Sequence, residues 1–295
     1  ATLLSACAPA FQQQAVDTSA WGRRYATVDG FQLHYDIIGG KQADGAAAKS
    51  TVLYLHGYSG FMNVWEPLAR SLADEHRSIL VDLPGHGLSD RRQADYSPQG
   101  VAHILWGFLD GLGVERVSLV GHSWGASIAA AMILERPDQV EKLVIADGWL
   151  YLEQNGMFMD WAQAPGVGEA LYQVFYDQQV EYRYALAFHD PERWVDEAVL
   201  GPMTRMMERF PGAKASGLAV IRELRGLPKQ EARYGEIACP ALLVWCREDR
   251  ISDPHYGERF ANEIQAAQLE LIGPCGHMPM IEQAARFGAL VEGFL

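Results

Sequence analysis

Hydrophobic and polar residues along the chain follow two alternating patterns, which predict strands and helices in turn. The continuous apolar run 51–55 is typical of a strand buried on both faces of a sheet. Segment 98–112 has apolar residues three or four positions apart, which predicts a helix. The dipeptide Asp29-Gly30 joins two β-rich runs, 23–28 and 31–38, and predicts a hairpin. Further strands are predicted at 78–81, 116–120, 142–147, 241–245 and 269–272, and further helices at 64–73, 254–266 and 279–295.

This order predicts an α/β fold with a mostly parallel sheet and helices on both of its faces. The alternation lapses between Trp149 and about Arg225, where the chain is helical in pattern and rich in Trp, Tyr, Phe and Met. We therefore expect one core domain built from 21–148 and 226–295, and a helical cap domain at 149–225.

Composition excludes some classes of function. The chain has 295 residues, 49% of them apolar and 21% charged, as in ordinary globular proteins. Its formal net charge of −13, without a basic cluster, argues against nucleic acid as a partner. No apolar run reaches the ~18–20 residues that a membrane-spanning helix needs.

The N-terminal stretch Leu4-Ser5-Ala6-Cys7 is similar to the lipobox of bacterial lipoproteins. The resemblance implies that the earlier part of a signal precedes residue 1, that Cys7 carries a lipid anchor, and that 8–20 is a polar tether. The protein would then be exported and anchored to a membrane in the periplasm or at the cell surface. The alternative is a cytoplasmic protein with a chance cysteine in an ordinary N-terminus.

The sequence Gly121-His122-Ser123-Trp124-Gly125 lies between a predicted strand and an alanine-rich helical run. Gly-x-Ser-x-Gly at such a junction is the nucleophile elbow. A sharp turn with positive φ lifts the serine hydroxyl clear of the sheet, beside the N-terminus of the helix. A side chain at either glycine would collide with the tightly folded backbone.

Polar residues follow the other strands at their carboxyl ends, where parallel sheets gather their chemistry. This rule selects His56, Asp82, Ser123, Asp147, Asp249 and His277.

With Ser123, Asp249 and His277 in this order, the chain resembles the α/β-hydrolase fold superfamily from about residue 23 to 295. The likeness also rests on His56-Gly57 and on the run from Asp82 to Ser89. It implies an eight-stranded sheet and a catalytic triad, with Ser123 as nucleophile, His277 as base and Asp249 as the acid that orients the base. Asp147 is the rival for the acid, because some relatives carry it after the preceding strand.

The same resemblance implies an oxyanion hole made by the backbone N–H groups of Tyr58 and Trp124. We expect His56 and Asp82 to brace these loops, together with His86, and His122 to be a packed, hydrogen-bonded residue. No metal site and no cofactor are predicted.

The cap composition suits a small-to-medium hydrophobic ester, so a carboxylesterase or lipase is the first interpretation. Carbon–carbon bond hydrolases of ring-cleavage products, thioesterases and lactonases share the triad, and Cys275-Gly276-His277 looks somewhat like the first of these. A serine nucleophile argues against haloalkane dehalogenases and epoxide hydrolases. A receptor for an apolar ligand is the alternative outside enzymes. Basic residues that could hold a substrate anion after folding are Arg183, Arg205 and Arg222.

The remaining cysteines are Cys239, Cys246 and Cys275, without metal-ligand spacing. If the protein is exported, Cys246 and Cys275 are candidates for a disulfide, because both follow strands that we expect to be neighbours.

Overall fold

The computed structural model describes residues 9–13, 24–40, 48–195, 210 and 212–295, with the backbone alone at 157–158 and 175–184. Its centre is an eight-stranded sheet in the order β1-β2-β4-β3-β5-β6-β7-β8. Only β2 runs against its neighbours, and the pairs from β4 to β8 are all parallel. The strands are β1 (Arg24–Val28), β2 (Phe31–Gly39), β3 (Ser50–Leu55), β4 (His76–Val81), β5 (Val117–His122), β6 (Val140–Ala146), β7 (Ala241–Cys246) and β8 (Ala267–Ile272). The predicted α/β fold is confirmed.

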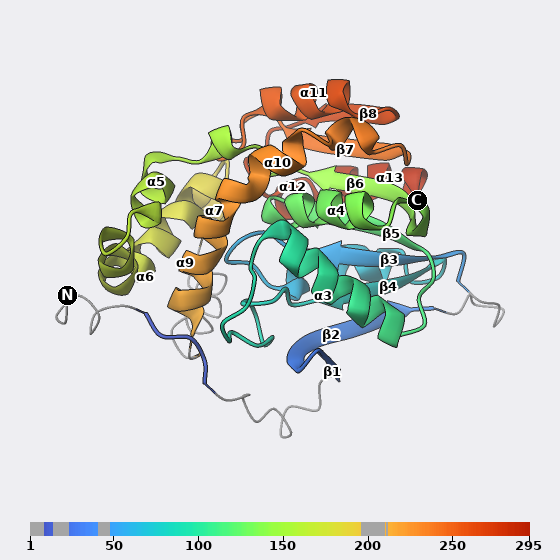
Figure 1. Cartoon of the computed structure of the whole chain (residues 1–295). Helices are drawn as coiled ribbons and strands as arrows, with labels where there is room; N and C mark the ends of the chain where they lie inside the picture. Colours follow the sequence, from blue (N-terminus) through green and yellow to red (C-terminus); the bar gives the residue numbers. More distant parts are fainter. Residues whose placement is uncertain (1–8, 14–23, 41–47, 196–209, 211) are drawn as a thin grey trace.

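Helices cover both faces of the sheet (Figure 1), and a hydrophobic layer lies on each face. One layer contains buried residues of α3 (Pro98–Gly111), α4 (Trp124–Glu135) and α11 (Pro254–Glu263). The other contains residues of α2 (Glu66–Ser71), α12 (Pro279–Glu282) and α13 (Ala284–Phe294). The apolar strands face both layers, which is why they read as continuous hydrophobic runs. Short 3-10 segments add buried residues to these layers at η2 (Met62–Trp65) and η6 (Tyr234–Glu236), whereas η3 (Pro137–Gln139) has none.

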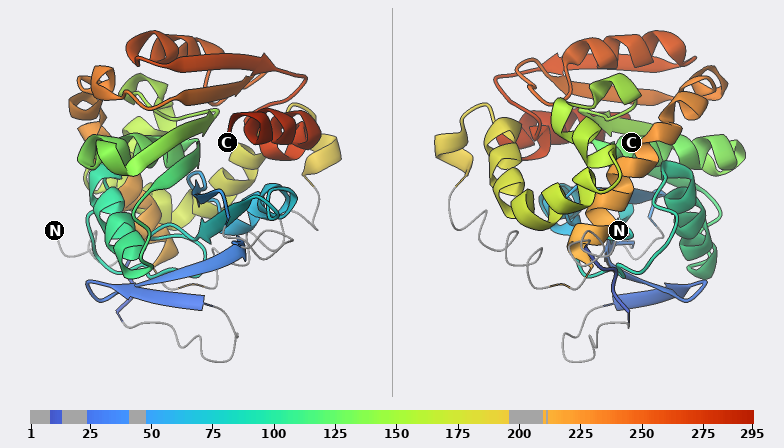
Figure 2. Two further views of the ribbon diagram at one scale, coloured as in Figure 1. Left: turned by 90° about the vertical axis from the view of Figure 1, so that its right-hand side faces the viewer. Right: turned by 60° about the vertical axis from the view of Figure 1, so that its left-hand side comes forward.

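A helical insertion separates β6 from β7, as the lapse in alternation predicted (Figure 2). Its described elements are η4 (Leu152–Gln154), α5 (Met157–Gln163), α6 (Val167–Ala187), α7 (Pro191–Trp194), α9 (Ala213–Glu223), η5 (Leu224–Gly226) and α10 (Leu227–Glu231). Several of its aromatic residues are buried, including Trp149, Tyr151, Tyr172 and Phe188, and the first three belong to the same hydrophobic cluster as α3 and α4. Within the ranges that the structure describes, we find no helix both long and apolar enough to cross a membrane.

The segment 279–295 forms two helices where the sequence predicted one. Gln283 leaves the helical conformation at φ −125° and ψ 38°, and its side chain donates a hydrogen bond to the carbonyl oxygen of Pro274 at 2.7 Å. This bond ties the break to the loop that carries His277.

Part of the predicted N-terminal tether packs against the core. Gln12 is only 6% exposed, and it exchanges hydrogen bonds with Arg91 through backbone N–H and side-chain oxygen. The Phe11 ring stacks on Tyr96 with centroids 6.3 Å apart. Residues 9–13 of the expected polar tether therefore pack against the core and bury a polar side chain with satisfied hydrogen bonds. The rest of the expected tether and Cys7 lie outside the described residues.

Candidate active site

The nucleophile elbow has the predicted conformation. Ser123 lies between β5 and α4 with φ 51° and ψ −120°, and only four non-glycine residues of the described chain have positive φ. Strain of this kind costs an L-residue about 1–3 kcal/mol and collects at functional sites. Its backbone N–H bonds to the Ala146 carbonyl at the end of β6, which holds the turn against the neighbouring strand. Ser123 therefore projects from the carboxyl edge of the sheet.

Glycines allow the close packing of this turn. A Cβ on Gly121 would lie 2.7 Å from the carbonyl oxygen of Gly125, and a Cβ on Gly125 would collide with the carbonyl oxygen of Leu55. A Cβ on Gly57 would meet the Ser123 Cβ at 3.0 Å. The loop after β3 therefore contacts the elbow at Ser123. The collisions at Gly121 and Gly125 are those that the sequence predicted for the two positions that flank the turn.

His277 and Asp249 form a hydrogen-bonded pair. Nδ1 of His277 lies 2.7 Å from Oδ2 of Asp249, and both side chains are buried. The other carboxylate oxygen of Asp249 accepts the backbone N–H groups of Ile251 and Ser252 at 2.7 and 3.0 Å. Because the pair uses Nδ1–H as the donor, Nε2 of the neutral imidazole is left as a proton acceptor. Sequence reasoning favoured Asp249 over Asp147 as the partner of His277, and the hydrogen bond agrees with that choice.

The elbow and the base loop are joined through the residue before the serine. His122 Nε2–H donates to the carbonyl oxygen of His277 at 2.7 Å, and the two imidazole centroids are 4.7 Å apart. Within the described chain, Ser123 Oγ makes no hydrogen bond to His277. Catalytic hydrogen bonds of unliganded enzymes are often long and tighten when substrate binds.

The expected oxyanion donors lie on the two loops that meet at Ser123. Trp124 is the first residue of α4, so its N–H has no acceptor within the helix. Tyr58 follows Gly57 on the β3 loop, and its hydroxyl is hydrogen-bonded to that of Tyr172 at 2.6 Å. The placement is compatible with an anion site beside the serine.

His56 and Asp82 brace these loops as predicted. His56 Nδ1–H donates to the Gly57 carbonyl, and its Nε2 accepts the backbone N–H of Leu83 at 3.0 Å. Asp82 accepts backbone N–H groups from the loops that follow β3 and β4, together with the His34 imidazole. The loop after β3 is thereby fixed to the loop after β4.

Three buried histidines next to the site are held neutral. Burial lowers the pKa of His86 to about 3, and its ring lies between those of His56 and Trp124. Burial also lowers the pKa of His56, and lowers that of His122 well below the usual value. His122 is packed and hydrogen-bonded, as predicted. His86, which was predicted to belong to the bracing loop, donates from Nδ1 to the Pro84 carbonyl within that loop.

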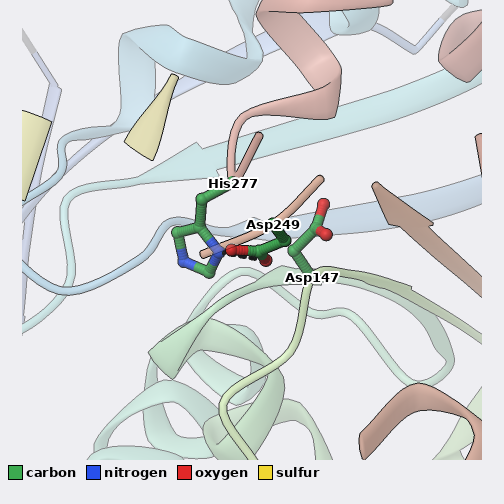
Figure 3. A group of neighbouring side chains, drawn as sticks. All are labelled: Asp147, Asp249 and His277. Carbon is green, nitrogen blue, oxygen red and sulfur yellow. Dashed lines mark hydrogen bonds and ion pairs between the residues drawn. The ribbon is translucent and has the colours of Figure 1, made fainter. Parts of the chain in front are cut away.

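Asp147 lies next to the pair without bonding to the imidazole (Figure 3). It follows β6 with φ 44°, and its Oδ1 accepts the backbone N–H of Cys246 at 2.8 Å. One ligand atom each of Asp147, Asp249 and His277 lies within 4.8 Å of the others, so these are the described residues that could also hold a cation. The hydrogen bond joins His277 directly to Asp249 and not to Asp147, which is the arrangement expected of a base and the acid that orients it.

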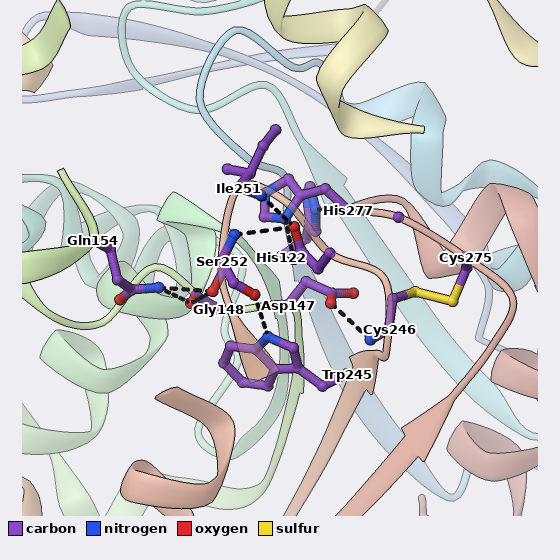
Figure 4. A network of polar contacts seen from close by, with 12 residues as sticks. His122, Asp147, Gly148, Gln154, Trp245, Cys246, Ile251, Ser252, Cys275 and His277 are labelled. Carbon is purple, nitrogen blue, oxygen red and sulfur yellow. Dashed lines mark hydrogen bonds and ion pairs between the residues drawn. A yellow bond between two sulfur atoms is a disulfide. The ribbon is translucent and has the colours of Figure 1, made fainter. Parts of the chain in front are cut away.

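A disulfide joins Cys246 to Cys275 (Figure 4). Cys246 ends β7 three residues before Asp249, and Cys275 precedes His277 by two residues. The bridge therefore fixes the acid loop to the base loop. The conditional pairing predicted from the sequence is confirmed, because β7 and β8 are adjacent and parallel.

The helical insertion touches the base loop through backbone contacts that the sequence did not indicate. The His277 N–H donates to the Ala187 carbonyl at the end of α6. Glu282 accepts the N–H of Gly276 with one oxygen and that of His189 with the other, at 2.7 and 2.9 Å. A glutamate five positions beyond the histidine carries no recognisable pattern, so only the folded chain reveals this clamp.

The basic residues considered for anion binding are only partly described. Arg222 on α9 pairs with Glu169 on α6 at 2.8 Å, so one of its nitrogens is engaged within the insertion. The Arg183 side chain and Arg205 lie outside the described part.

A sheet of this topology with an elbow serine and a histidine–aspartate pair defines the α/β-hydrolase class. The chain belongs to the alpha/beta hydrolase family, whose sequence pattern it matches over residues 52–290, and it is a hydrolase. It is similar to a 2-hydroxy-6-oxononadienedioate/2-hydroxy-6-oxononatrienedioate hydrolase of Paraburkholderia phymatum, with 31% identity over 90% of this chain and 91% of the relative.

Two further relatives agree with this class. A 2-hydroxymuconate semialdehyde hydrolase of Pseudomonas sp. strain CF600 is 31% identical over 78% of this chain and 80% of its own. The structure of a variant of CumD, a meta-cleavage product hydrolase of Pseudomonas fluorescens, superposes with a TM-score of 0.77 and 21% identity, covering 92% of this chain and 97% of that one.

Proposed function

We propose that this hydrolase cleaves a carbon–carbon bond in a 2-hydroxy-6-oxo-dienoate, the kind of compound named for its relatives. Identity of about 30% over most of both chains supports this reading above the carboxylesterase that composition favoured. The observation that carries the proposal is the hydrogen-bonded His277–Asp249 pair beside the elbow of Ser123. These three residues are the proposed base, acid and nucleophile.

The proposed reaction begins at the 6-oxo carbon. Ser123 Oγ attacks this carbonyl while His277 Nε2 takes the hydroxyl proton, and the N–H groups of Tyr58 and Trp124 receive the oxyanion. The step proceeds from the 2-oxo tautomer of the substrate, in which the 2-hydroxyl proton has moved to C5 and C5 is saturated. The bond from C6 to C5 then breaks, and its electron pair passes through C4 and C3 onto the C2 oxygen, which takes the proton from His277. Water, deprotonated by His277, releases the acyl group as a carboxylic acid and restores Ser123.

The helical insertion is the proposed cap over this site. The hydroxyl groups of Tyr172 and Tyr58 are hydrogen-bonded, which brings α6 against the oxyanion loop. Ser216 on α9 donates to the Gly85 carbonyl at 2.9 Å. Together with the bond from His277 to Ala187, these contacts place the insertion against three strand-end loops. A cover in this position would exclude water from the carbanion until its protonation.

A second candidate is the ester hydrolase of the first interpretation, and the Cys246–Cys275 disulfide favours it. Disulfides persist in oxidising compartments, so the bridge supports export of the protein, in line with the lipobox-like Leu4-Ser5-Ala6-Cys7. Outside the cytoplasm, esters and lipids are available substrates. We therefore propose that the protein is exported and that Cys7 is its lipid attachment site. The class of substrate that the protein cleaves distinguishes the carbon–carbon bond hydrolase from the ester hydrolase.

One substrate panel tests these proposals. The purified protein is assayed on 2-hydroxymuconate semialdehyde, 2-hydroxy-6-oxononadienedioate and p-nitrophenyl butyrate. We expect kcat/KM on a dienoate to exceed that on the ester by at least about 100-fold, and Ser123→Ala to lower it about 1,000-fold or more. Ser71→Ala, a serine substitution on α2, is the matched control. The reverse ranking supports the ester hydrolase, and full activity of Ser123→Ala overturns both. Binding without turnover identifies a receptor.

A further inference from the structure

Asp147 is a buried carboxyl group that the proposed reaction does not use. Its side chain is completely buried at the end of β6. Oδ1 accepts the N–H of Cys246, whereas Oδ2 is buried and receives no hydrogen bond from a donor of the described chain. Burying a neutral polar group without a hydrogen bond costs about 2–7 kcal/mol by transfer scales, and burying an ionised carboxylate in the same way costs far more. The group needs either a proton or an unseen partner.

The polar group that faces Asp147 is the carboxyl of Asp249. Ligand atoms of the two side chains and of His277 lie within 4.8 Å of one another. Two carboxylates at such a distance do not both ionise in a buried site, because their charges repel and little water screens them. One of the pair must therefore hold a proton.

The hydrogen bonds decide which carboxyl holds it. Asp249 accepts three donors, the N–H groups of Ile251 and Ser252 and the Nδ1–H of His277, and each favours its charged form. Asp147 accepts only one donor, the N–H of Cys246, on Oδ1. The charge thus belongs on Asp249 and the proton on Oδ2 of Asp147.

Electrostatics point the same way. Burial, followed by the charge of Asp249 and a side-chain hydrogen bond with it, holds the pKa of Asp147 well above its usual value. The Cys246 N–H opposes this shift and does not outweigh it.

We propose that Asp147 is a positioning residue, protonated at Oδ2, which donates a hydrogen bond to the Asp249 carboxylate and so holds that carboxylate against His277. The role rests on the proposed function, since it acts through the proposed acid and base. The proton neutralises Asp147, so the imidazole faces a pair with a single negative charge. The hydrogen bond also occupies a lone pair of Asp249 that would otherwise be unsatisfied.

Asparagine is the matched test, because its amide reproduces the neutral acid. In Asp147→Asn the side-chain oxygen can still accept the Cys246 N–H, and the NH₂ group can still donate to Asp249. We expect Asp147→Asn to keep kcat/KM within about 3-fold and to leave the acid limb of its pH profile unchanged. Asp147→Ala removes the donor, and its kcat is expected to fall about 10- to 100-fold, in the range of lost orienting partners.

The pH profile excludes a merely structural role. If Asp147 were ionised, Asp147→Asn would remove a negative charge near the His277 imidazole and move the acid limb of the profile to lower pH. An acid limb displaced in this way overturns the proposal. If Asp147→Ala fails to fold, Asp147→Asn alone still gives the decisive result.

Infrared difference spectroscopy gives a reading that needs no catalysis. The spectrum of the unaltered protein at neutral pH, minus that of Asp147→Asn, should contain the C=O stretch of a protonated carboxyl group. Asp110→Asn, an exposed aspartate paired with Arg136, should give a carboxylate difference instead. Absence of the acid band overturns the proposal even if the enzyme is active. Conversely, the acid band can be present while the Ser123→Ala variant still turns over substrate. That result contradicts the proposed function and leaves the protonation of Asp147 supported.

Discussion

His122 Nε2 donates a hydrogen bond to the backbone carbonyl of His277 across a gap of 2.7 Å. The residue that precedes the proposed nucleophile thus holds the backbone of the proposed base, although 155 positions separate them in the chain. Burial keeps His122 neutral, so it serves as a fixed donor whose other nitrogen lies toward Gly57. The hydrogen bond from His122 to the His277 carbonyl therefore links the loop that carries Ser123 to the loop that carries His277.

Replacing His122 should therefore impair turnover more than binding. His122→Ala leaves the His277 carbonyl without its donor, and an unsatisfied buried acceptor lowers stability by about 1–3 kcal/mol. We expect kcat to fall about 10- to 100-fold with KM nearly unchanged, measured by steady-state kinetics on the preferred substrate. His103→Ala, an exposed histidine on α3, is the control. Equal losses in both variants would contradict a specific role for His122.

The disulfide should contribute strongly to stability. Cys246 and Cys275 close a loop with a sequence separation of 29 residues, for which chain entropy predicts about 3–4 kcal/mol. We expect the double variant Cys246→Ser/Cys275→Ser to unfold at a lower urea concentration by a corresponding amount and to lose activity at lower temperature. Cys239→Ser, which removes the free cysteine of the described residues, is the control. Unchanged unfolding in the double variant would show that the bridge adds nothing.

Gly276 should tolerate no side chain. A Cβ there would lie 2.5 Å from the Ala187 carbonyl oxygen and 2.8 Å from the His189 nitrogen, both backbone atoms of the insertion. Gly276→Ala is therefore expected to push the insertion from the base loop and to lower kcat/KM at least about 10-fold. Gly156→Ala adds the same methyl group where nothing lies within 4 Å. Wild-type activity in Gly276→Ala would mean that the contact with Ala187 does not matter.

The protein should lose stability on mild acidification. The pKa of His86 is about 3 in the folded chain, and those of His56 and His122 are also lowered, against about 6.5 in an unfolded chain. Below about pH 6.5 these three histidines are therefore protonated in the unfolded state and remain neutral in the folded state. Each histidine then removes up to about 1.4 kcal/mol per pH unit, and its full contribution is present only above about pH 6.5.

Urea unfolding at pH 8 and at pH 5.5 measures this loss. His86→Gln should reduce the difference between the two pH values, whereas His255→Gln, at an exposed position, should not. A free energy of unfolding that stays constant between the two pH values would refute the linkage.

Much of the fold followed from local pattern. Continuous apolar runs identified the parallel strands because both faces of the sheet are covered, and the elbow was recognisable because its five residues are consecutive. The helix 279–295 was wrong as a single element, since the break at Gln283 depends on a contact with Pro274, which belongs to another loop. The docking of Gln12 on Arg91 was missed for the same reason.

The class of fold, the elbow serine and the polar residues at the strand ends could all be predicted, because they depend on hydrophobic periodicity and on consecutive residues. The division of roles among those polar residues became evident in the folded chain alone. Asp249 bonds to His277 while Asp147 lies behind it, and Glu282 and His122 secure the base loop. Such assignments depend on distances of a few ångströms between loops far apart in the chain, and these distances exist only once the sheet has brought the strand ends to one edge.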